Sequence, residues 1–241
     1  ISISKQASLK GIKTITSFFS EKLALEILND NGEASIITAN NVFAHSDNLR
    51  EIIHGIKKIL SADGLFIFEV SYLVDVYEKT LFDTIYHEHL AYHSVKPLKK
   101  FFEINDMELI DVERISTHGG SIRGFVQKIE GKRKVKESVK ELIELEKHLC
   151  LHDINGFLKF SNQILEIKTK LNALIDKIKG EGKTIAGFGA PAKATTLMYQ
   201  LGINKKCIDY IVDDNPLKQG KFTPGLNIPI YSSEIIKEKK P

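Results

Sequence analysis

The feature that most constrains the fold is a strand–helix–strand pattern near the start of the chain. Two short apolar runs, ASIITA (34–39) and GLFIFEV (64–70), flank a segment (47–60) in which leucine and isoleucine recur every three to four positions. Continuous apolar runs of this length are typical of strands buried on both faces, and the spacing between them is that of an amphipathic helix. The pattern predicts two parallel strands joined by a crossover helix, with ligands bound beyond the carboxyl ends of the strands.

A second such pattern lies near the end of the chain. We expect a strand at 183–188, a helix at 192–201 and a strand at 207–212. Between the two patterns, the region 135–179 has helical periodicity almost throughout. The sequence therefore predicts an α/β protein whose two α/β regions are connected by long helices.

The remaining stretch between these regions contains a helix and two strands in our prediction. Residues 96–105 are expected to form the helix, and the runs 108–115 and 121–129 are expected to form strands on either side of a glycine-containing turn. The polar and aromatic stretch 71–94 carries no regular periodicity.

Composition and charge place the chain among ordinary globular proteins. It has 241 residues, of which 42% are hydrophobic, and a formal net charge of +3. A field this weak indicates neither nucleic acid nor a membrane surface as a partner, and no apolar run approaches the roughly 20 residues of a membrane span. Cys150 and Cys207 lie outside any CxxC spacing, which argues against a disulfide framework or a cysteine zinc site. We therefore expect a cytoplasmic protein.

The densest group of reactive side chains is the sequence YHEH (86–89), followed by Tyr92 and His93. A histidine can remove a proton near neutral pH, a carboxylate can orient it, and a tyrosine hydroxyl can donate to a developing oxyanion. A proton next to a ketone would be a suitable target. His89 and His93 could instead bind a metal, but the HExxH pattern fails at Ala91, so we expect no metal site. A polar loop without chemistry is a further alternative.

The sequence GFGAPAK (187–193) has the GxGxxA form of a dinucleotide-binding turn. Glycines in such a turn let backbone N–H groups approach a pyrophosphate at a helix N-terminus. Asp213 and Asp214 follow the next expected strand, near the place of a ribose-binding acid, and Lys193 suits a phosphate or a carboxylate. A tight strand-to-helix turn without a ligand accounts for the same pattern.

The glycine-containing turn THGGSIR (117–123) also has a functional and a structural interpretation. His118 and Arg123 could face a charged ligand from a backbone that the glycines allow to take unusual angles. As the turn of a hairpin, the segment needs no function.

Several of these segments together resemble one family, the S-adenosylmethionine-dependent sugar C-methyltransferases that act on nucleotide-linked 4-keto-deoxysugars. The matching segments keep the family's order and spacing over nearly the whole chain. They are ITANNVFAHSDNL (37–49), FDTIYHEHLAYHS (82–94), STHGGSIR (116–123), GFGAPAKATTL (187–197) and VDDNPLKQGKFTPGLNIPI (212–230). Each is longer and more distinctive than the glycine fingerprint alone.

The resemblance implies an enzyme that transfers the methyl group of S-adenosylmethionine to C3 of the sugar. The base that removes the C3 proton matches His89, and Glu88 and Tyr86 match the residues that position it and stabilise the developing charge. The family's cofactor-binding loop matches Asn40, Asn41 and His45. Its residues near the nucleotide-linked sugar match His118, Arg123, Gly189, Ala190, Lys193 and Asp213.

The resemblance also implies the domain organisation. Residues 1–130 correspond to a Rossmann-like S-adenosylmethionine-binding domain without its first strand and glycine-rich loop, 131–180 to a helical connector, and 181–241 to a second Rossmann-like domain that binds the sugar nucleotide. Ser2 stands near the position of the family's ribose-binding glutamate, so we expect impaired cofactor binding by this stretch alone. The family's zinc-binding N-terminal domain is not matched, and we expect zinc only in that domain.

Two other functions stay open at this point. The glycine fingerprint also fits an NAD(P)-dependent oxidoreductase, and the whole pattern fits a non-catalytic protein that binds nucleotide sugars.

Overall fold

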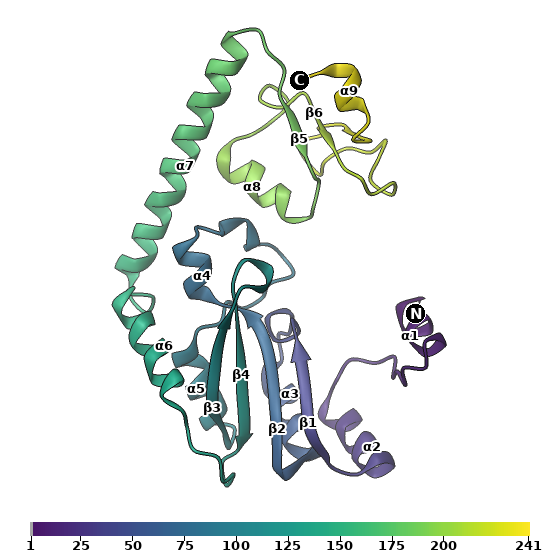
Figure 1. The fold of residues 1–241 in the computed structure, drawn as a ribbon, viewed down its shortest axis with the longest axis vertical. Helices are drawn as coiled ribbons and strands as arrows, with labels where there is room; N and C mark the ends of the chain where they lie inside the picture. Colours follow the sequence, from purple (N-terminus) through teal and green to yellow (C-terminus); the bar gives the residue numbers. More distant parts are fainter. Residues whose placement is uncertain (1) are drawn as a thin grey trace. The chain divides into compact units, whose positions relative to one another are not determined.

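The computed structural model describes residues 2–241, which form two compact units, each assembled from separate stretches of the sequence (Figure 1). Unit 1 contains the described residues up to Val70 together with Val95–Glu113 and Ile122–Glu141. Unit 2 contains Ser71–Ser94, Arg114–Ser121 and Leu142–Pro241. This division differs from the sequential boundaries at residues 130 and 180, and the three functional domains inferred from the sequence stay a prediction.

The first half of the chain supplies a four-stranded sheet and the helices connected to it. These elements are α1 (Ser2–Leu9), α2 (Glu21–Asn31), β1 (Ala34–Asn40), the 3-10 turn η1 (Phe43–His45), α3 (Leu49–Ile59), β2 (Leu60–Ser71), α5 (Val95–Glu103), β3 (Met107–Ile115) and β4 (Ser121–Lys128). The sheet has the order β1-β2-β4-β3, with β1 parallel to β2 and β4 antiparallel to its neighbours (Figure 1). The parallel β1–α3–β2 unit confirms the first predicted pattern.

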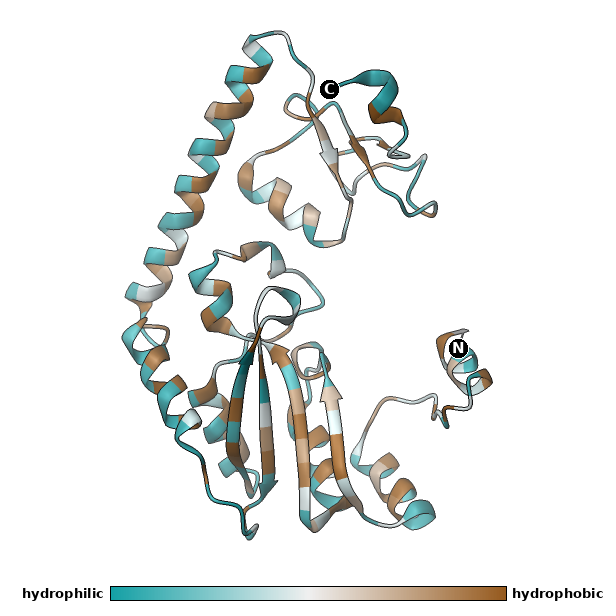
Figure 2. Cartoon of the chain, in the orientation of Figure 1, coloured by the Kyte–Doolittle hydropathy of each residue, from teal (hydrophilic) through white to brown (hydrophobic). Residues whose placement is uncertain are grey.

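Four aromatic rings form the core of unit 1. Phe43, Phe66, Phe68 and Phe102 have no exposed surface, and their ring centroids lie 5.5–6.5 Å apart. Two of these rings come from β2, where residues of alternating orientation send Phe66 and Phe68 to the same face. Figure 2 shows the corresponding hydrophobic bands on the strands. Burial of aromatic side chains of this size supplies much of the free energy that holds a sheet and its helices together.

The expectation that 34–39 is buried on both faces is wrong. No residue of β1 is fully buried, and Ile36 exposes 64% of its surface. The physical reason is position: β1 lies at an edge of the described sheet and pairs with β2 on one side only. The apolar run indicated a strand correctly, but it carried no information about how many neighbours the strand has.

The predicted helical region 135–179 is two helices, α6 (Glu137–His148) and the 27-residue α7 (Ile154–Gly180). Cys150 adopts a left-handed backbone conformation (φ 56°), which L-residues other than glycine rarely take and which ends the first helix. Asp153 then begins α7, because its carboxylate accepts the N–H of Asn155 at 2.7 Å. Hydrophobic periodicity continues across the break, so the periodicity alone could not locate it.

The rest of unit 2 contains short helices and a small parallel sheet. These elements are α4 (Leu73–Glu78), η2 (Phe82–Thr84), η3 (Thr117–Gly119), β5 (Ala186–Phe188), α8 (Lys193–Leu201), β6 (Tyr210–Val212), β7 (Ile230–Tyr231) and α9 (Ile235–Lys239). The strand order is β5-β6-β7, with both pairs parallel. The β5–α8–β6 unit confirms the second predicted pattern, whereas α4 lies in the stretch for which the sequence predicted no element.

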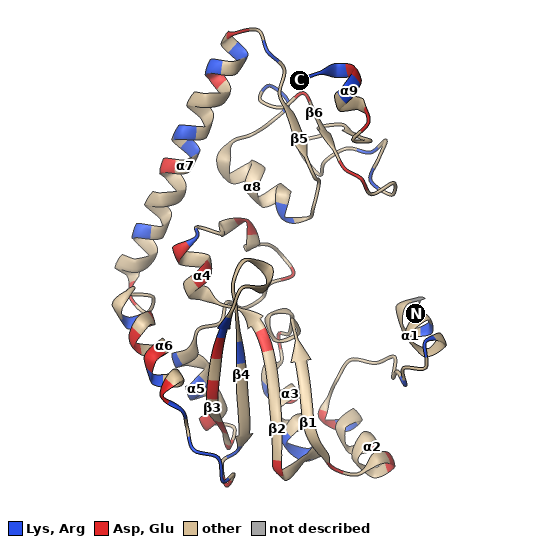
Figure 3. Cartoon of the chain, viewed as in Figure 1, with Lys and Arg blue, Asp and Glu red and all other residues tan. Residues whose placement is uncertain are grey.

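The apolar core of unit 2 joins the α8 side of this sheet to η2. Phe82 of η2 belongs to the same buried cluster as Met198 and Leu201 of α8 and Ile211 of β6. The segment that leads to the YHEH sequence therefore packs directly on the C-terminal α/β region. Charged residues of both signs are interspersed on both units, as expected from the small net charge (Figure 3). Over residues 2–241, no helix is both long and apolar enough to cross a membrane.

The aromatic core predicts the effect of adding one methyl group. A Cβ atom at Gly124 of β4 would overlap the ring of Phe68. This ring is fully buried among other side chains and has no free space to move into. We expect Gly124→Ala to lower the free energy of unfolding by about 1–3 kcal/mol, the usual cost of overpacking. Urea denaturation measures this change. Gly180→Ala is the matched control, because a Cβ at Gly180 meets no atom within 4 Å; equal stability of the two variants would contradict the prediction.

Candidate active site

The backbone carbonyl of Thr84 accepts side-chain hydrogen bonds from the YHEH sequence and from Tyr92, which follows it. The Nδ1 atom of His89 lies 2.9 Å from this oxygen, and the hydroxyl of Tyr92 donates to the same oxygen at 2.7 Å. The segment has little regular structure of its own, since only η2 and a few turn hydrogen bonds order it. The first of these contacts ties the imidazole of His89 to the backbone at Thr84, and the second restrains the same carbonyl.

The contact with Thr84 also determines which nitrogen of His89 carries hydrogen. A carbonyl oxygen can only accept, so Nδ1 must be the donor. In the neutral ring, the lone pair then lies on Nε2, which makes Nε2 the atom able to remove a proton.

Tyr86 and Glu88 lie beside His89, as the sequence predicted. The Tyr86 hydroxyl donates to Glu88 Oε2 at 3.2 Å, and the centroids of the Tyr86 and His89 rings are 4.7 Å apart. Burial and the neighbouring Glu88 carboxylate raise the pKa of Tyr86, so the phenol stays protonated and able to donate at neutral pH. The structure thus brings together an imidazole, a carboxylate and a hydroxyl donor. Over residues 2–241, no group of three or more His, Cys, Asp or Glu side chains could hold a metal ion.

His118 belongs to the same unit and lies in a strained turn. Its backbone is left-handed (φ 52°, ψ 30°), a conformation that costs energy in a residue with a side chain. Lys79 holds this turn through a hydrogen bond to the Gly119 carbonyl, and Lys79 is itself paired with the buried Asp75. The exposed side chain of His118 therefore lies in a turn that the hydrogen bond from Lys79 holds in place.

The sequence analysis did not identify a cluster of charged side chains that supports this turn, formed by Asp75, Lys79 and Arg114. Arg114 donates two hydrogen bonds of 2.9 Å to Asp75. Burial alone would raise the pKa of Asp75, but the hydrogen bonds from Arg114 and Lys79 hold it below its usual value. No local motif marks these residues, because Asp75 and Arg114 are 39 positions apart in sequence.

A second buried polar group was missed for the same reason. The hydroxyl of Tyr72 donates to the fully buried Glu146 at 2.9 Å, and His152 Nε2 lies 3.2 Å from the other carboxylate oxygen. Burial and the Glu146 charge raise the pKa of Tyr72. The backbone N–H of Tyr72 donates to the Gly120 carbonyl, so this network supports the end of the His118 turn.

The predicted cofactor residues lie in unit 1. Asn40 ends β1, Asn41 follows it with a left-handed backbone (φ 53°), and His45 ends η1. All three are exposed at the carboxyl end of a parallel strand, where α/β folds bind ligands. The Asn41 N–H donates to the backbone carbonyl of Glu69 at 2.8 Å, which determines the path of the loop.

Arg123 is separated from His118 by the division of the chain. Arg123 belongs to unit 1, where its guanidinium donates to Glu69 Oε2 at 3.0 Å, while His118 belongs to unit 2. Their role toward a substrate stays a prediction.

The glycine turn has the predicted geometry, but its hydrogen bonds serve the protein itself. Gly189 has φ 86°, and the Ala190 N–H donates to Asp213 Oδ2 at 2.7 Å. Hydrogen bonds from the backbone N–H groups of Ala190 and Asn215 lower the pKa of Asp213 to about 2, and the side-chain ammonium of Lys218 adds a smaller effect in the same direction. The N–H that would face a pyrophosphate in a dinucleotide site is thus occupied by a carboxylate. This arrangement argues against the oxidoreductase interpretation.

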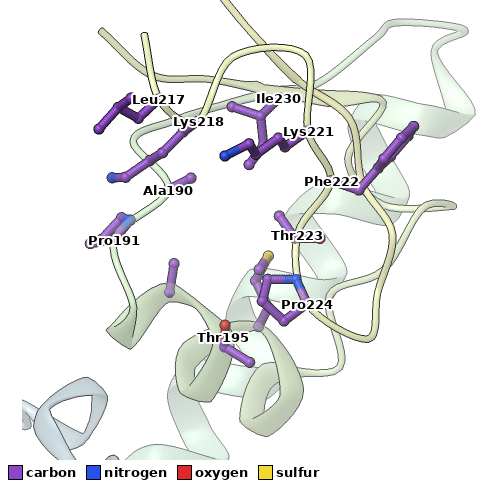
Figure 4. A pocket seen from close by; sticks show the side chains of 12 residues that line it. Ala190, Pro191, Thr195, Leu217, Lys218, Lys221, Phe222, Thr223, Pro224 and Ile230 are labelled. Atoms are coloured by element: carbon purple, nitrogen blue, oxygen red, sulfur yellow. The ribbon is translucent and has the colours of Figure 1, made fainter. Parts of the chain in front are cut away.

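A pocket of about 220 Å³ opens beside this turn (Figure 4). Most of its wall is apolar, including Pro191, Pro224 and Met198. Lys218 and Lys221 lie along one side and Thr195 of α8 on the opposite side. Both lysines lie in the matching segment 212–230, but of the residues that line this pocket the sequence analysis named only Ala190 as a site residue.

Comparison with known proteins shows the family of the chain. The family described as "C-methyltransferase C-terminal domain" matches residues 116–241, which is more than half of the chain. The chain belongs to the C-methyltransferase family. It is 33% identical over 228 residues to the C-methyltransferase NovU of Streptomyces niveus, covering 95% of this chain. The chain spans about half the length of NovU, 54% of it.

Solved structures resemble this C-methyltransferase chain more distantly. One is a SAM-dependent methyltransferase from Anabaena variabilis ATCC 29413, with TM-score 0.35 and 10% identity over 45% of this chain and 55% of that one. Another is the magnesium protoporphyrin IX methyltransferase of Synechocystis PCC 6803 with bound SAH, with TM-score 0.32 and 10% identity over 40% and 45% of the two chains. Scores this low carry no argument about function. The Rossmann-like α/β class is evident from the parallel β1–α3–β2 and β5–α8–β6 units.

The hydrogen bonds of Asp213 predict a pH dependence of stability. Its pKa of about 2 in the folded protein lies below the value of about 3.9 expected in the unfolded chain. The carboxylate therefore stabilises the folded state above about pH 4, and this contribution is lost as the pH falls toward 2. We expect Asp213→Asn to be less stable than the wild type at pH 7, with a smaller difference at pH 2. Urea denaturation at both pH values tests this; a difference that does not depend on pH would contradict it.

The neighbouring Asp214→Asn is the control. The Asp214 side chain is exposed and accepts one hydrogen bond from Ser233, so its replacement should leave the acid transition close to that of the wild type.

Proposed function

We propose that this chain contains the catalytic part of an S-adenosylmethionine-dependent C-methyltransferase that methylates C3 of a nucleotide-linked 4-keto-deoxysugar. The observation that carries the proposal is the His89–Thr84 contact, which places hydrogen on Nδ1 and therefore the basic lone pair of the neutral imidazole on Nε2. Family membership supports transfer of a methyl group to carbon. Methylation of carbon requires a carbon nucleophile, and removal of a C–H proton produces one.

The ketone explains why a single histidine can remove the C3 proton. A carbonyl at C4 acidifies the proton at C3, because the electron pair left behind is delocalised onto the C4 oxygen. His89 Nε2 takes the proton, and the resulting imidazolium returns it to solvent after the turnover. The hydroxyl of Tyr86 donates its single hydrogen to Glu88 in the free protein, and Glu88 thereby holds the phenol in place. When the substrate binds, this hydrogen can turn to the sugar oxygen and stabilise the charge that develops there.

The residues of unit 1 fit the cofactor that this reaction needs. When bound there, S-adenosylmethionine would supply an electrophilic methyl group for the C3 carbon. Exposed amide and imidazole side chains at a strand end, such as Asn40, Asn41 and His45, offer donors and acceptors suited to its ribose, base and amino-acid groups. The amide side chains of Asn40 and Asn41 carry no charge, which is compatible with a ligand that carries a positive sulfonium.

The pocket of unit 2 fits the nucleotide part of the substrate. An apolar wall with two prolines suits the flat face of a nucleobase, and the ammonium groups of Lys218 and Lys221 suit the diphosphate. Lys218 is paired with Asp213 at 2.9 Å, whereas Lys221 has no ion pair among the interactions found for the described residues. Lys221 is therefore the lysine that we expect to contribute most to phosphate binding.

Replacement of His89 tests the proposed reaction at its first step. We expect the protein to exchange the C3 proton of a 4-keto-deoxysugar nucleotide with D₂O, and His89→Ala to slow this exchange by about a hundredfold or more, the usual contribution of a general base. Proton NMR of the sugar measures the loss of the C3 signal. His87→Ala, which removes an exposed neighbouring imidazole, should exchange at the wild-type rate. Binding of the sugar nucleotide without any wild-type exchange would favour a non-catalytic binding protein.

Replacement of Lys221 tests the nucleotide pocket. A lost charge-assisted hydrogen bond costs about 1.5–3 kcal/mol, so Lys221→Met should weaken binding of a nucleoside diphosphate by about ten- to a hundredfold. Titration calorimetry measures the affinity. Lys205→Met removes an equal charge from an exposed turn that does not line the pocket and should bind as the wild type does. Equal weakening in both variants would show an effect of overall charge and refute the assignment.

A further inference from the structure

Helix α8 contacts the segment that holds His89 through two side chains. The Thr196 hydroxyl donates to the backbone carbonyl of Ile85 at 3.0 Å, and Lys193 Nζ lies 3.2 Å from Asp83 Oδ2. Lys193 and Thr196 are three residues apart in the helix, so they lie on one face of it. Both contacts belong to unit 2, in which α8 and η2 also pack through their apolar side chains.

The two contacts lie on either side of the residue that orients the base. Asp83 precedes Thr84 and Ile85 follows it, while the Thr84 carbonyl accepts from His89 and Tyr92. A peptide carbonyl can turn only if the dihedral angles of the adjacent residues change. By holding the carboxylate of Asp83 and the carbonyl of Ile85, α8 restrains the backbone on both sides of the Thr84 carbonyl.

This restraint matters because the segment has only short turns and a few side-chain hydrogen bonds of its own. The backbone hydrogen bonds within it are single turns, such as Ile85 N–H to Phe82 and His89 N–H to Tyr86. If the Thr84 carbonyl turned away, His89 would lose the partner that keeps hydrogen on Nδ1, and the tautomer with hydrogen on Nε2 would become populated. That tautomer cannot accept a proton at Nε2.

We infer that Lys193 and Thr196 of α8 are positioning residues for the base, acting through Asp83 and Ile85 to hold the Thr84 carbonyl toward His89. The inference rests on the proposed role of His89. It gives Lys193 a different task from the substrate contact expected from the sequence. The adjacent positions Ala194 and Thr195 line the nucleotide pocket, so a single helix serves the substrate on one face and the base on the other.

Three variants separate positioning from substrate binding. Thr196→Val removes the hydroxyl with little change in shape, Thr196→Ser keeps a hydroxyl, and Lys193→Met removes the charge. Gln200→Ala, an exposed position of the same helix, is the control. Circular dichroism establishes that each variant is folded before the measurements.

Two measurements decide the inference. In ¹⁵N NMR spectra of the imidazole of His89, we expect the wild type, Thr196→Ser and Gln200→Ala to show the Nδ1–H tautomer, and Thr196→Val and Lys193→Met to show a mixture of tautomers. In the C3 exchange assay, Thr196→Val and Lys193→Met should lower kcat by about three- to tenfold, the loss expected for one hydrogen bond, with KM unchanged.

The contrary results are equally specific. An unchanged tautomer in folded Thr196→Val and Lys193→Met would overturn the inference, as would a rise in KM at constant kcat for Lys193→Met, which would mark Lys193 as a substrate ligand. If the wild-type protein exchanged no C3 proton, the proposed function would fail, and the NMR measurement would still decide whether α8 controls the His89 tautomer.

Discussion

The hydrogen bonds that meet at the Thr84 carbonyl are the constraint on which the candidate active site depends. One oxygen accepts from His89 Nδ1 at 2.9 Å and from the Tyr92 hydroxyl at 2.7 Å, so it determines both the position of the imidazole and its tautomer. The surrounding segment has almost no regular secondary structure, so few backbone hydrogen bonds of its own restrain it. Functional side chains on loops are usually positioned by a rigid scaffold, and here α8 and η2 form that scaffold.

The C-terminal α/β region shows how a familiar turn can be used for a different purpose. The strand, glycine turn and helix of a dinucleotide-binding unit are present at β5 and α8. Asp213 occupies the N–H of Ala190, and the space for a ligand lies beside the turn, under Lys218 and Lys221. The glycine motif predicted the backbone conformation of the turn correctly, but it did not predict that an N–H group of the turn binds the Asp213 carboxylate and not a ligand.

Much of the fold and part of the site could be predicted from the sequence. Both strand–helix–strand units were correct because apolar runs and helical periodicity report local structure directly. The grouping of Tyr86, Glu88 and His89 was also predictable, since four consecutive residues in a turn remain neighbours. The burial of β1 was wrong, and the interruption at Cys150 was missed, because neither the neighbours of a strand nor a single left-handed residue changes the hydrophobic pattern.

The sequence by itself determined which elements form, which residues can act as base, donor or ligand, and, through several long motifs, the family of the chain. Only the tertiary structure decided how those residues act: which nitrogen of His89 bears hydrogen, which partner holds Lys193, and whether Asp213 faces a ligand or the backbone. The physical reason is separation along the chain. Thr196 lies 111 residues from Ile85 and Asp213 lies 23 residues from Ala190, and hydrogen bonds over such distances exist only after packing has brought the groups together.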